Sequence, residues 1–157
     1  MPSAWPAVWE AVQEFTDLFG EDTILIGGVA VYLHAQSSTL PNEHTQDADL
    51  AVGLAAWTDV RELYEVTPNR RLSKHQLVIG DIEFDLYLEH NHRLRVDYAQ
   101  LAARAVRVGT LRVADLEHLL LLKLDAFKAR EFSAHGEKDR RDIAKILVLL
   151  ADREPSL

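Results

Sequence analysis

TQDADLAV, residues 45–52, carries the clearest indication of the fold of this chain. Apolar residues alternate in it with Asp47 and Asp49, which is the pattern of a strand with one buried face and one polar face. Residues two apart in a strand point the same way, so the two aspartates share a face at a spacing of about 7 Å. Two such carboxylates, with a third from a neighbouring strand, can hold a pair of divalent cations. The stretch therefore predicts a site of the kind used in phosphoryl transfer.

The stretch TILIGGVA, residues 23–30, precedes it. Its apolar, β-branched start predicts a buried strand from Thr23 to Ile26, and its end predicts a helix from Val29 to about Ala35. Between them, Gly27 and Gly28 would allow a close backbone approach to an anionic group at the start of that helix. The alternative is that the glycines serve only a tight turn.

A third carboxylate is expected in the hairpin that follows. A turn signal at residues 80–81 separates a strand over 76–79 from a strand over 82–88, and the alternation in the second strand places Asp85 on its polar face. Glu83 lies on the same face and is the main competitor, while Asp81 at the turn is a weaker one. Asp85 is favoured because apolar neighbours on both sides place it well inside the strand.

Composition sets the limits of function. The chain has 157 residues, 48% of them apolar, which predicts a single domain over 1–157 with a substantial core. The absence of cysteine excludes disulfides, Cys-ligated zinc and thiol catalysis. No signal peptide or membrane span is recognisable, so we expect a soluble, cytoplasmic protein without a membrane partner. The net charge of −8 argues against extended, nonspecific binding to nucleic acid, although a local basic site is compatible with it.

The pattern of the rest of the chain predicts an α/β (α+β) fold, in which a small mixed β-sheet is flanked by helices and followed by a C-terminal helical pair. The core is expected over about 20–113 and the helical pair over about 114–150. The other predicted elements are helices at 4–19, 55–64, 114–130 and 138–150, a hairpin with strands at 105–108 and 111–113, and loops at 37–44 and 131–137.

Charged residues in the last two helices need an explanation. Lys123 lies in an otherwise apolar segment, where an unpaired ammonium would be costly to bury. Its side chain therefore reaches the surface, meets an acidic partner or meets a bound phosphate. Lys138 and Asp142 have the i, i+4 spacing of an ion pair, which as a surface pair would contribute a few tenths of a kcal/mol.

Taken together, these motifs resemble a known family. ILIGGVA at 24–30, T-x-D-x-D at 45–49 and the strand carboxylate Asp85 resemble the nucleotidyltransferase fold of the DNA polymerase β superfamily. LLLKLDA at 120–126 and KDRRDI at 138–143 are similar to the C-terminal pattern of AbiEii- and MenT-like toxin–antitoxin nucleotidyltransferases. The resemblance covers roughly residues 23–150.

The resemblance implies roles for the residues that carry it. Mg²⁺, with Mn²⁺ as an alternative, would be held by Asp47, Asp49 and Asp85, and Asp85 would also take the proton from an attacking hydroxyl. An NTP would be the substrate. The residues implied in nucleotide binding are Gly27, Gly28, Thr45, Lys123, Lys138 and Asp139.

The function implied is transfer of an NMP group from an NTP to a hydroxyl of a macromolecule, in a toxin–antitoxin or phage-defence setting. An RNA 3′ end, such as that of tRNA, is the favoured acceptor, and a protein side chain is the next. Relatives often carry an arginine two residues before the threonine, where this chain has Glu43. A second hypothesis is therefore a weakly active or inactive module that binds nucleotide or a cognate toxin or antitoxin.

Overall fold

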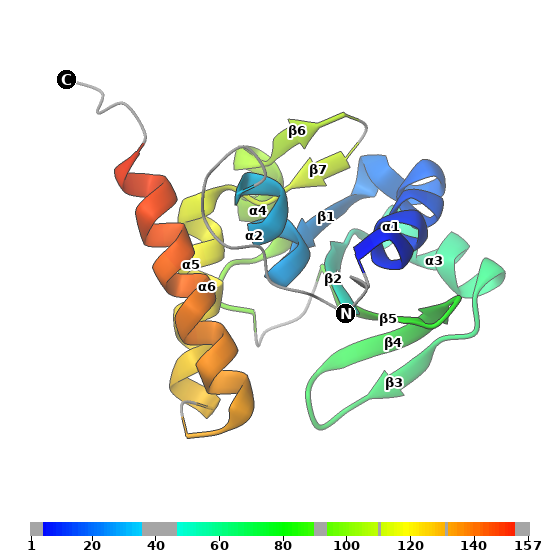
Figure 1. Cartoon of the computed structure of the whole chain (residues 1–157). Coiled ribbons are helices and arrows are strands. Elements are labelled where there is room, and N and C mark those ends of the chain that lie inside the picture. The colour runs from blue at the N-terminus through cyan, green and yellow to red at the C-terminus, as the bar shows by residue number, and fades with distance from the viewer. Residues whose placement is uncertain (1–4, 36–46, 90–93, 110, 131, 153–157) are drawn as a thin grey trace.

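A seven-stranded mixed sheet runs through the centre of the protein, with strand order β3-β4-β5-β2-β1-β7-β6 (Figure 1). The computed structural model describes residues 5–35, 47–89, 94–109, 111–130 and 132–152. The pairs β2/β5 and β1/β7 are parallel, and the other neighbours are antiparallel. The strands are β1 (Thr23–Ile26), β2 (Asp47–Val52), β3 (Thr67–Asn69), β4 (Lys74–Ile79), β5 (Ile82–Leu88), β6 (Val106–Val108) and β7 (Leu111–Val113).

Helices cover the sheet in two groups. Two of them lie over one face: the Phe15 ring of α1 is 5.4 Å from Phe84 of β5, and the Trp57 ring of α3 is 4.7 Å from His75 of β4. The second group, α2, α5 and α6, packs together on the other side of β1 and β2 (Figure 1). The helices are α1 (Trp5–Phe19), the 3₁₀ turn η1 (Gly20–Asp22), α2 (Gly27–Ala35), α3 (Leu54–Leu63), α4 (Tyr98–Arg104), α5 (Leu116–Arg130) and α6 (Ala134–Ala151).

Alternation in β2 and β5 explains how the sheet separates its core from its polar side. Leu50 of β2 and Phe84 and Leu86 of β5 are completely buried on the face beneath α1. Their neighbours Asp49 and Asp85 point to the opposite face, because successive residues in a strand alternate sides. The predicted strands at 23–26, 47–52 and 82–88 are confirmed at these bounds.

Several predicted boundaries are wrong. The loop expected over 131–137 is too long, since α6 begins at Ala134; Ser133 caps it by accepting a hydrogen bond from the Gly136 amide at 3.3 Å. Helix α2 begins at Gly27 instead of Val29, and β3 was not predicted at all. The loop predicted at 37–44 lies outside the described residues.

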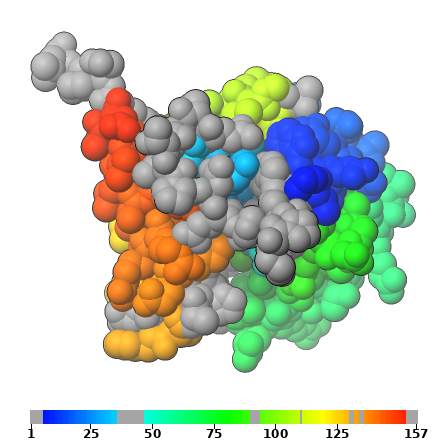
Figure 2. Space-filling view, in the orientation of Figure 1, coloured from blue at the N-terminus to red at the C-terminus, as the bar shows by residue number. Residues whose placement is uncertain are grey.

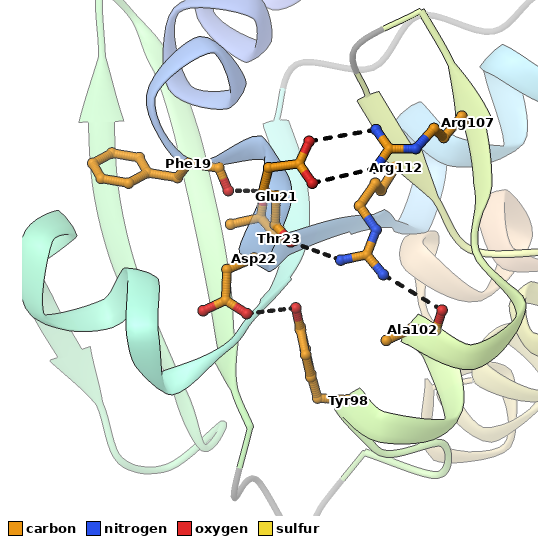
Figure 3. Close-up of polar contacts among 8 residues, drawn as sticks. All are labelled: Phe19, Glu21, Asp22, Thr23, Tyr98, Ala102, Arg107 and Arg112. Atoms are coloured by element: carbon orange, nitrogen blue, oxygen red, sulfur yellow. Dashed lines mark hydrogen bonds and ion pairs between the residues drawn. The ribbon is translucent and has the colours of Figure 1, made fainter.

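A polar junction around η1, at the start of β1, links this end of the strand to α4 and β7 (Figure 3). Asp22 accepts hydrogen bonds of 2.8 Å from the Tyr98 hydroxyl and from the Ala56 amide at the start of α3. Arg112 donates to the Glu21 carbonyl at 2.8 Å, and so ties β7 to η1. A hollow of about 410 Å³ lies beside this junction, between α1 and α3, and includes Asp59 in its lining. It is at the opposite end of β1 from Gly27.

No helix in the described part of the chain combines the length and the apolar character needed to cross a membrane.

In the space-filling view, α6 and the strands β3, β4 and β5 lie on opposite sides of the face that is seen (Figure 2).

Candidate functional site

The predicted carboxylates meet where β2 and β5 run parallel. Asp49 is aligned with Asp85 across the two strands, and Asp47 is aligned with Glu83. On the other side of β2, Ile26 at the end of β1 is aligned with Asp49. Asp47 is exposed, Asp49 is partly exposed and Asp85 is only 5% exposed. The register therefore gathers the acidic residues around the point where β1 gives way to α2.

Gly27 has a reason to be glycine that neither sequence interpretation included. Its backbone has φ +70°, a conformation that L side chains rarely adopt, and a Cβ atom built on it would overlap Asp49 Oδ2. The glycine thus leaves room for the carboxylate of Asp49. Gly28 follows it in the first turn of α2.

The crowded carboxylates repel one another. Burial raises the pKa of Asp49 to about 7, with further increases from the negative charges of Asp85 and Asp47, while Lys123 and Lys74 partly offset them. A carboxylate in such surroundings favours a neutral form or a nearby cation. The site is therefore one that added positive charge would stabilise.

Asp85 is held by two residues of β4. Lys74 Nζ lies 3.0 Å from Asp85 Oδ2, and the Gln76 side-chain amide donates to Asp85 Oδ1 at 3.1 Å. The same amide donates to Glu83 Oε1 at 2.7 Å, so the predicted competitor Glu83 belongs to the same network but is exposed. No pattern in the sequence indicates the pairing of Lys74 with Asp85, because it depends on how β4 pairs with β5.

The donor set is suited to a hard divalent cation, because carboxylate oxygens are the ligands that Mg²⁺ prefers. Among the described residues, however, no group of three or more His, Cys, Asp or Glu side chains has an arrangement that could hold a metal ion. The contacts of Asp85 supply a physical reason, since Lys74 and Gln76 engage both of its oxygens. The carboxylates of Asp47, Asp49 and Asp85 are thus suitable cation ligands, and the strand register brings Asp49 and Asp85 together. In the structure, however, Asp85 is paired with Lys74.

Lys123 meets acidic partners, which was one of its three predicted environments. Its Nζ lies 2.8 Å from Asp142 Oδ2 and 3.5 Å from Asp139 Oδ1, and all three side chains are buried. Burial by itself lowers the pKa of Lys123, but the charges of Asp142, Asp49 and Asp139 outweigh it and raise the pKa above the usual value. Because Asp49 contributes, this α5–α6 cluster faces the carboxylate site.

Lys138 joins the same cluster, with its Nζ 3.4 Å from Asp142 Oδ2. The predicted i, i+4 pair is therefore present, but it is not a surface pair, because Asp142 is only 3% exposed. Thr45 and Glu43 lie outside the described residues, so their predicted roles stay predictions.

Comparisons with known proteins give a match in structure. No protein-family model matches the chain, and no curated protein matches its sequence significantly. The Megavirus polyadenylate synthase superposes on 97% of this chain with a TM-score of 0.67 and 10% identity; this chain spans 32% of that protein. An antigenic nucleotidyltransferase-like protein from Paracoccidioides brasiliensis covers 92% of this chain and is itself covered over 75%, with a TM-score of 0.58 and 18% identity.

A third structure, ANT(2″)-Ia in complex with adenylyl-2″-tobramycin, matches over 94% of both chains with a TM-score of 0.53 and 17% identity. At these identities the likeness concerns the fold. The chain has the nucleotidyltransferase fold, and the predicted fold class is confirmed.

Proposed function

We propose that this protein transfers a nucleotidyl group from an NTP to a hydroxyl group. The observation that carries the proposal is the alignment of Asp49 with Asp85 across β2 and β5, beside the close approach of Gly27 to Asp49. The fold adds support, because the solved structures that resemble the chain include a polyadenylate synthase.

In the proposed reaction, the hydroxyl oxygen of the acceptor attacks the α-phosphorus and forms a new P–O bond. The bond from the α-phosphorus to the bridging oxygen breaks, and pyrophosphate leaves with the bonding electrons. Asp85 takes the proton of the hydroxyl, and the amides of Gly27 and Gly28 at the start of α2 face the anionic phosphates. A divalent cation held by Asp47, Asp49 and Asp85 would neutralise triphosphate charge and make the hydroxyl a better nucleophile.

For the acceptor we propose an RNA 3′ end, with a protein hydroxyl as the next choice and a toxin–antitoxin or defence system as the setting. Arg70 and Arg71 support an anionic acceptor, because both are exposed between β3 and β4, four and three residues before Lys74. Attraction between such a local basic segment and phosphates can act despite the acidic balance of the whole chain.

A small-molecule acceptor is the third choice, since a protein that matches this one over 94% of both chains has been solved with an adenylylated aminoglycoside. The second candidate function is a module that binds nucleotide or a partner without transfer. The pairing of Lys74 with Asp85 favours it, because a carboxylate engaged in this way is not directed at a cation.

The test is incubation of the purified protein with each α-labelled NTP and Mg²⁺ or Mn²⁺, with total RNA, cell protein or an aminoglycoside as acceptor. We expect label in RNA with wild type and its loss in both Asp49→Asn and Asp85→Asn. Glu83→Gln is the matched control, because Glu83 is an exposed carboxylate of the same strand and network. It should retain transfer.

The outcomes separate the hypotheses. Label in protein or aminoglycoside instead of RNA would keep the reaction and change the acceptor. Binding of an NTP without transfer to any acceptor would favour the binding module. Neither binding of an NTP nor transfer would contradict both the proposed reaction and a nucleotide-binding module.

A further inference from the structure

We propose that Lys74 is an internal counter-ion, which holds Asp85 while no divalent cation is bound and leaves this carboxylate when one binds. The inference rests on the proposed function, because that function makes Asp85 a cation ligand. It concerns a residue of β4 that belongs to none of the motifs from which the site was predicted.

The first observation is the contact itself. Lys74 Nζ is 3.0 Å from Asp85 Oδ2, and the two side chains are only 13% and 7% exposed. A buried carboxylate beside Asp49 requires a positive partner, since an uncompensated charge is strongly disfavoured there. Lys74 supplies one positive charge at the carboxylate that a divalent cation would otherwise neutralise.

The second observation is the difference between the two lysines near the site. Lys123 is shared by Asp139 and Asp142, both of which are buried, so its departure would take a positive charge from two carboxylates at once. For Lys74 the close ion pair is with Asp85 alone among the described residues. A cation bound at Asp85 would replace the positive charge that Lys74 supplies to Asp85 and, at longer range, to Asp49.

The third observation is the place of Lys74 in the chain. It is the first residue of β4, next to the turn that holds Ser73 at φ +54°. Its side chain can change direction there without disturbing the paired middle of the strand. Gln76, which is aligned with Asp85 in the register of β4 and β5, keeps its hydrogen bond to Oδ1 in the meantime.

An internal counter-ion competes with the cation. Removing its charge while Asp85 stays intact should therefore strengthen cation binding in the absence of nucleotide. A lysine that served only to orient Asp85 as a ligand would have the opposite effect, since its loss would weaken binding. A lysine with a purely structural role would leave the affinity unchanged.

The experiment measures Mn²⁺ binding to the nucleotide-free protein, by electron paramagnetic resonance of free Mn²⁺ and by calorimetry. For Lys74→Met we expect a Kd lower by a factor of about ten or more, since each tenfold corresponds to about 1.4 kcal/mol and the loss of a buried ion pair exceeds that value. The rise in Tm on adding Mn²⁺ should also be larger than in wild type. Lys74→Gln, which keeps a donor for Asp85 but no charge, guards against a folding defect of the Met variant and should shift the Kd in the same direction.

Lys128→Met is the matched control, because Lys128 is an exposed lysine near the end of α5 and its loss changes the net charge equally. It should bind Mn²⁺ like wild type. An unchanged or higher Kd in both Lys74 variants would overturn the counter-ion proposal. Asp49→Asn tests the cation site separately: wild-type binding by this variant would contradict the metal role in the proposed function, whatever the Lys74 variants do.

Discussion

Asp49 lies opposite Asp85 across two parallel strands, so the backbone register itself brings two like charges together. The repulsion belongs to the folded state, because the two residues are 36 positions apart in sequence. Stability and the proposed chemistry therefore make opposite demands on this pair.

A first prediction concerns the pH dependence of stability. The pKa of Asp49 is raised to about 7 in the folded protein, so the folded state holds a proton that the unfolded state has already released. The contribution of Asp49 to the stability of the protein is most favourable below the ordinary aspartate pKa and becomes less favourable as the pH rises toward 7. Asp49→Asn should therefore stabilise the protein at about pH 8, by on the order of 1 kcal/mol after allowance for solvent screening, and much less at about pH 4.5.

Urea unfolding at both pH values, without divalent cations, measures this effect. Asp47→Asn is the comparison, because Asp47 is exposed and its replacement should give the smaller gain. Equal stability of wild type and Asp49→Asn at the higher pH would show that burial and the neighbouring carboxylates do not destabilise the charged form of Asp49.

A second prediction concerns Gly27. Gly27→Ala adds a Cβ atom that overlaps Asp49 Oδ2 at a backbone of φ +70°, and should cost roughly 2–4 kcal/mol of unfolding free energy. Gly80→Ala has the same kind of backbone, φ +62°, with no atom within 4 Å of the added Cβ, and should cost about 1 kcal/mol. Chemical denaturation of both variants isolates the collision; equal losses would mean that Asp49 moves aside freely.

A third prediction concerns the α5–α6 cluster. Lys123→Met leaves Asp139 and Asp142 buried without their shared cation, and should cost roughly 3–5 kcal/mol. Lys138→Met removes a partly exposed lysine from Asp142 and should cost less than about 1 kcal/mol. If Lys123→Met instead folds with nearly full stability and loses only NTP binding, its main role is phosphate contact.

A fourth prediction separates the far end of β1 from the site. Tyr98→Phe removes the 2.8 Å hydrogen bond to Asp22 and should lower stability by about 1 kcal/mol. Since Asp22 still caps α3, NTP binding and any transfer should stay at wild-type levels. A loss of either in the folded variant would connect this end of the sheet to the site.

The sequence was sufficient for the strands that carry the site, because alternation of buried and polar residues is strong in β2 and β5. The sequence was not sufficient for elements whose formation depends on contacts with distant parts of the chain. Thr67–Asn69 contains a proline and lacks an apolar pattern, and becomes β3 only by pairing with β4. The start of α6 was placed too late because Ser133 is an inconspicuous cap and Gly136 follows it within the first turn.

The site was predicted as a set of residue types, and its contacts were not. Spacing indicated that Asp47 and Asp49 share a face, and alternation placed Asp85 on the polar face of its own strand. The aligned position of Asp85 and its lysine partner depends on the registers of three strands. The acidic partners of Lys123 were one of three alternatives, since nothing in a linear pattern shows which residues of α6 face α5. Gly27 is explained only by its distance from a residue 22 positions later.

The strict alternation of β5 also affects how the chain finds its fold. A slip of one residue in the pairing of β5 would carry Asp85 beneath the aromatic rings of α1 and place Phe84 among the charged side chains of Asp49 and Lys74, because such a shift exchanges the two faces of a strand. The carboxylates proposed to act on substrate would thereby penalise a misassembled sheet. The same side chains would therefore disfavour incorrect strand pairing during folding.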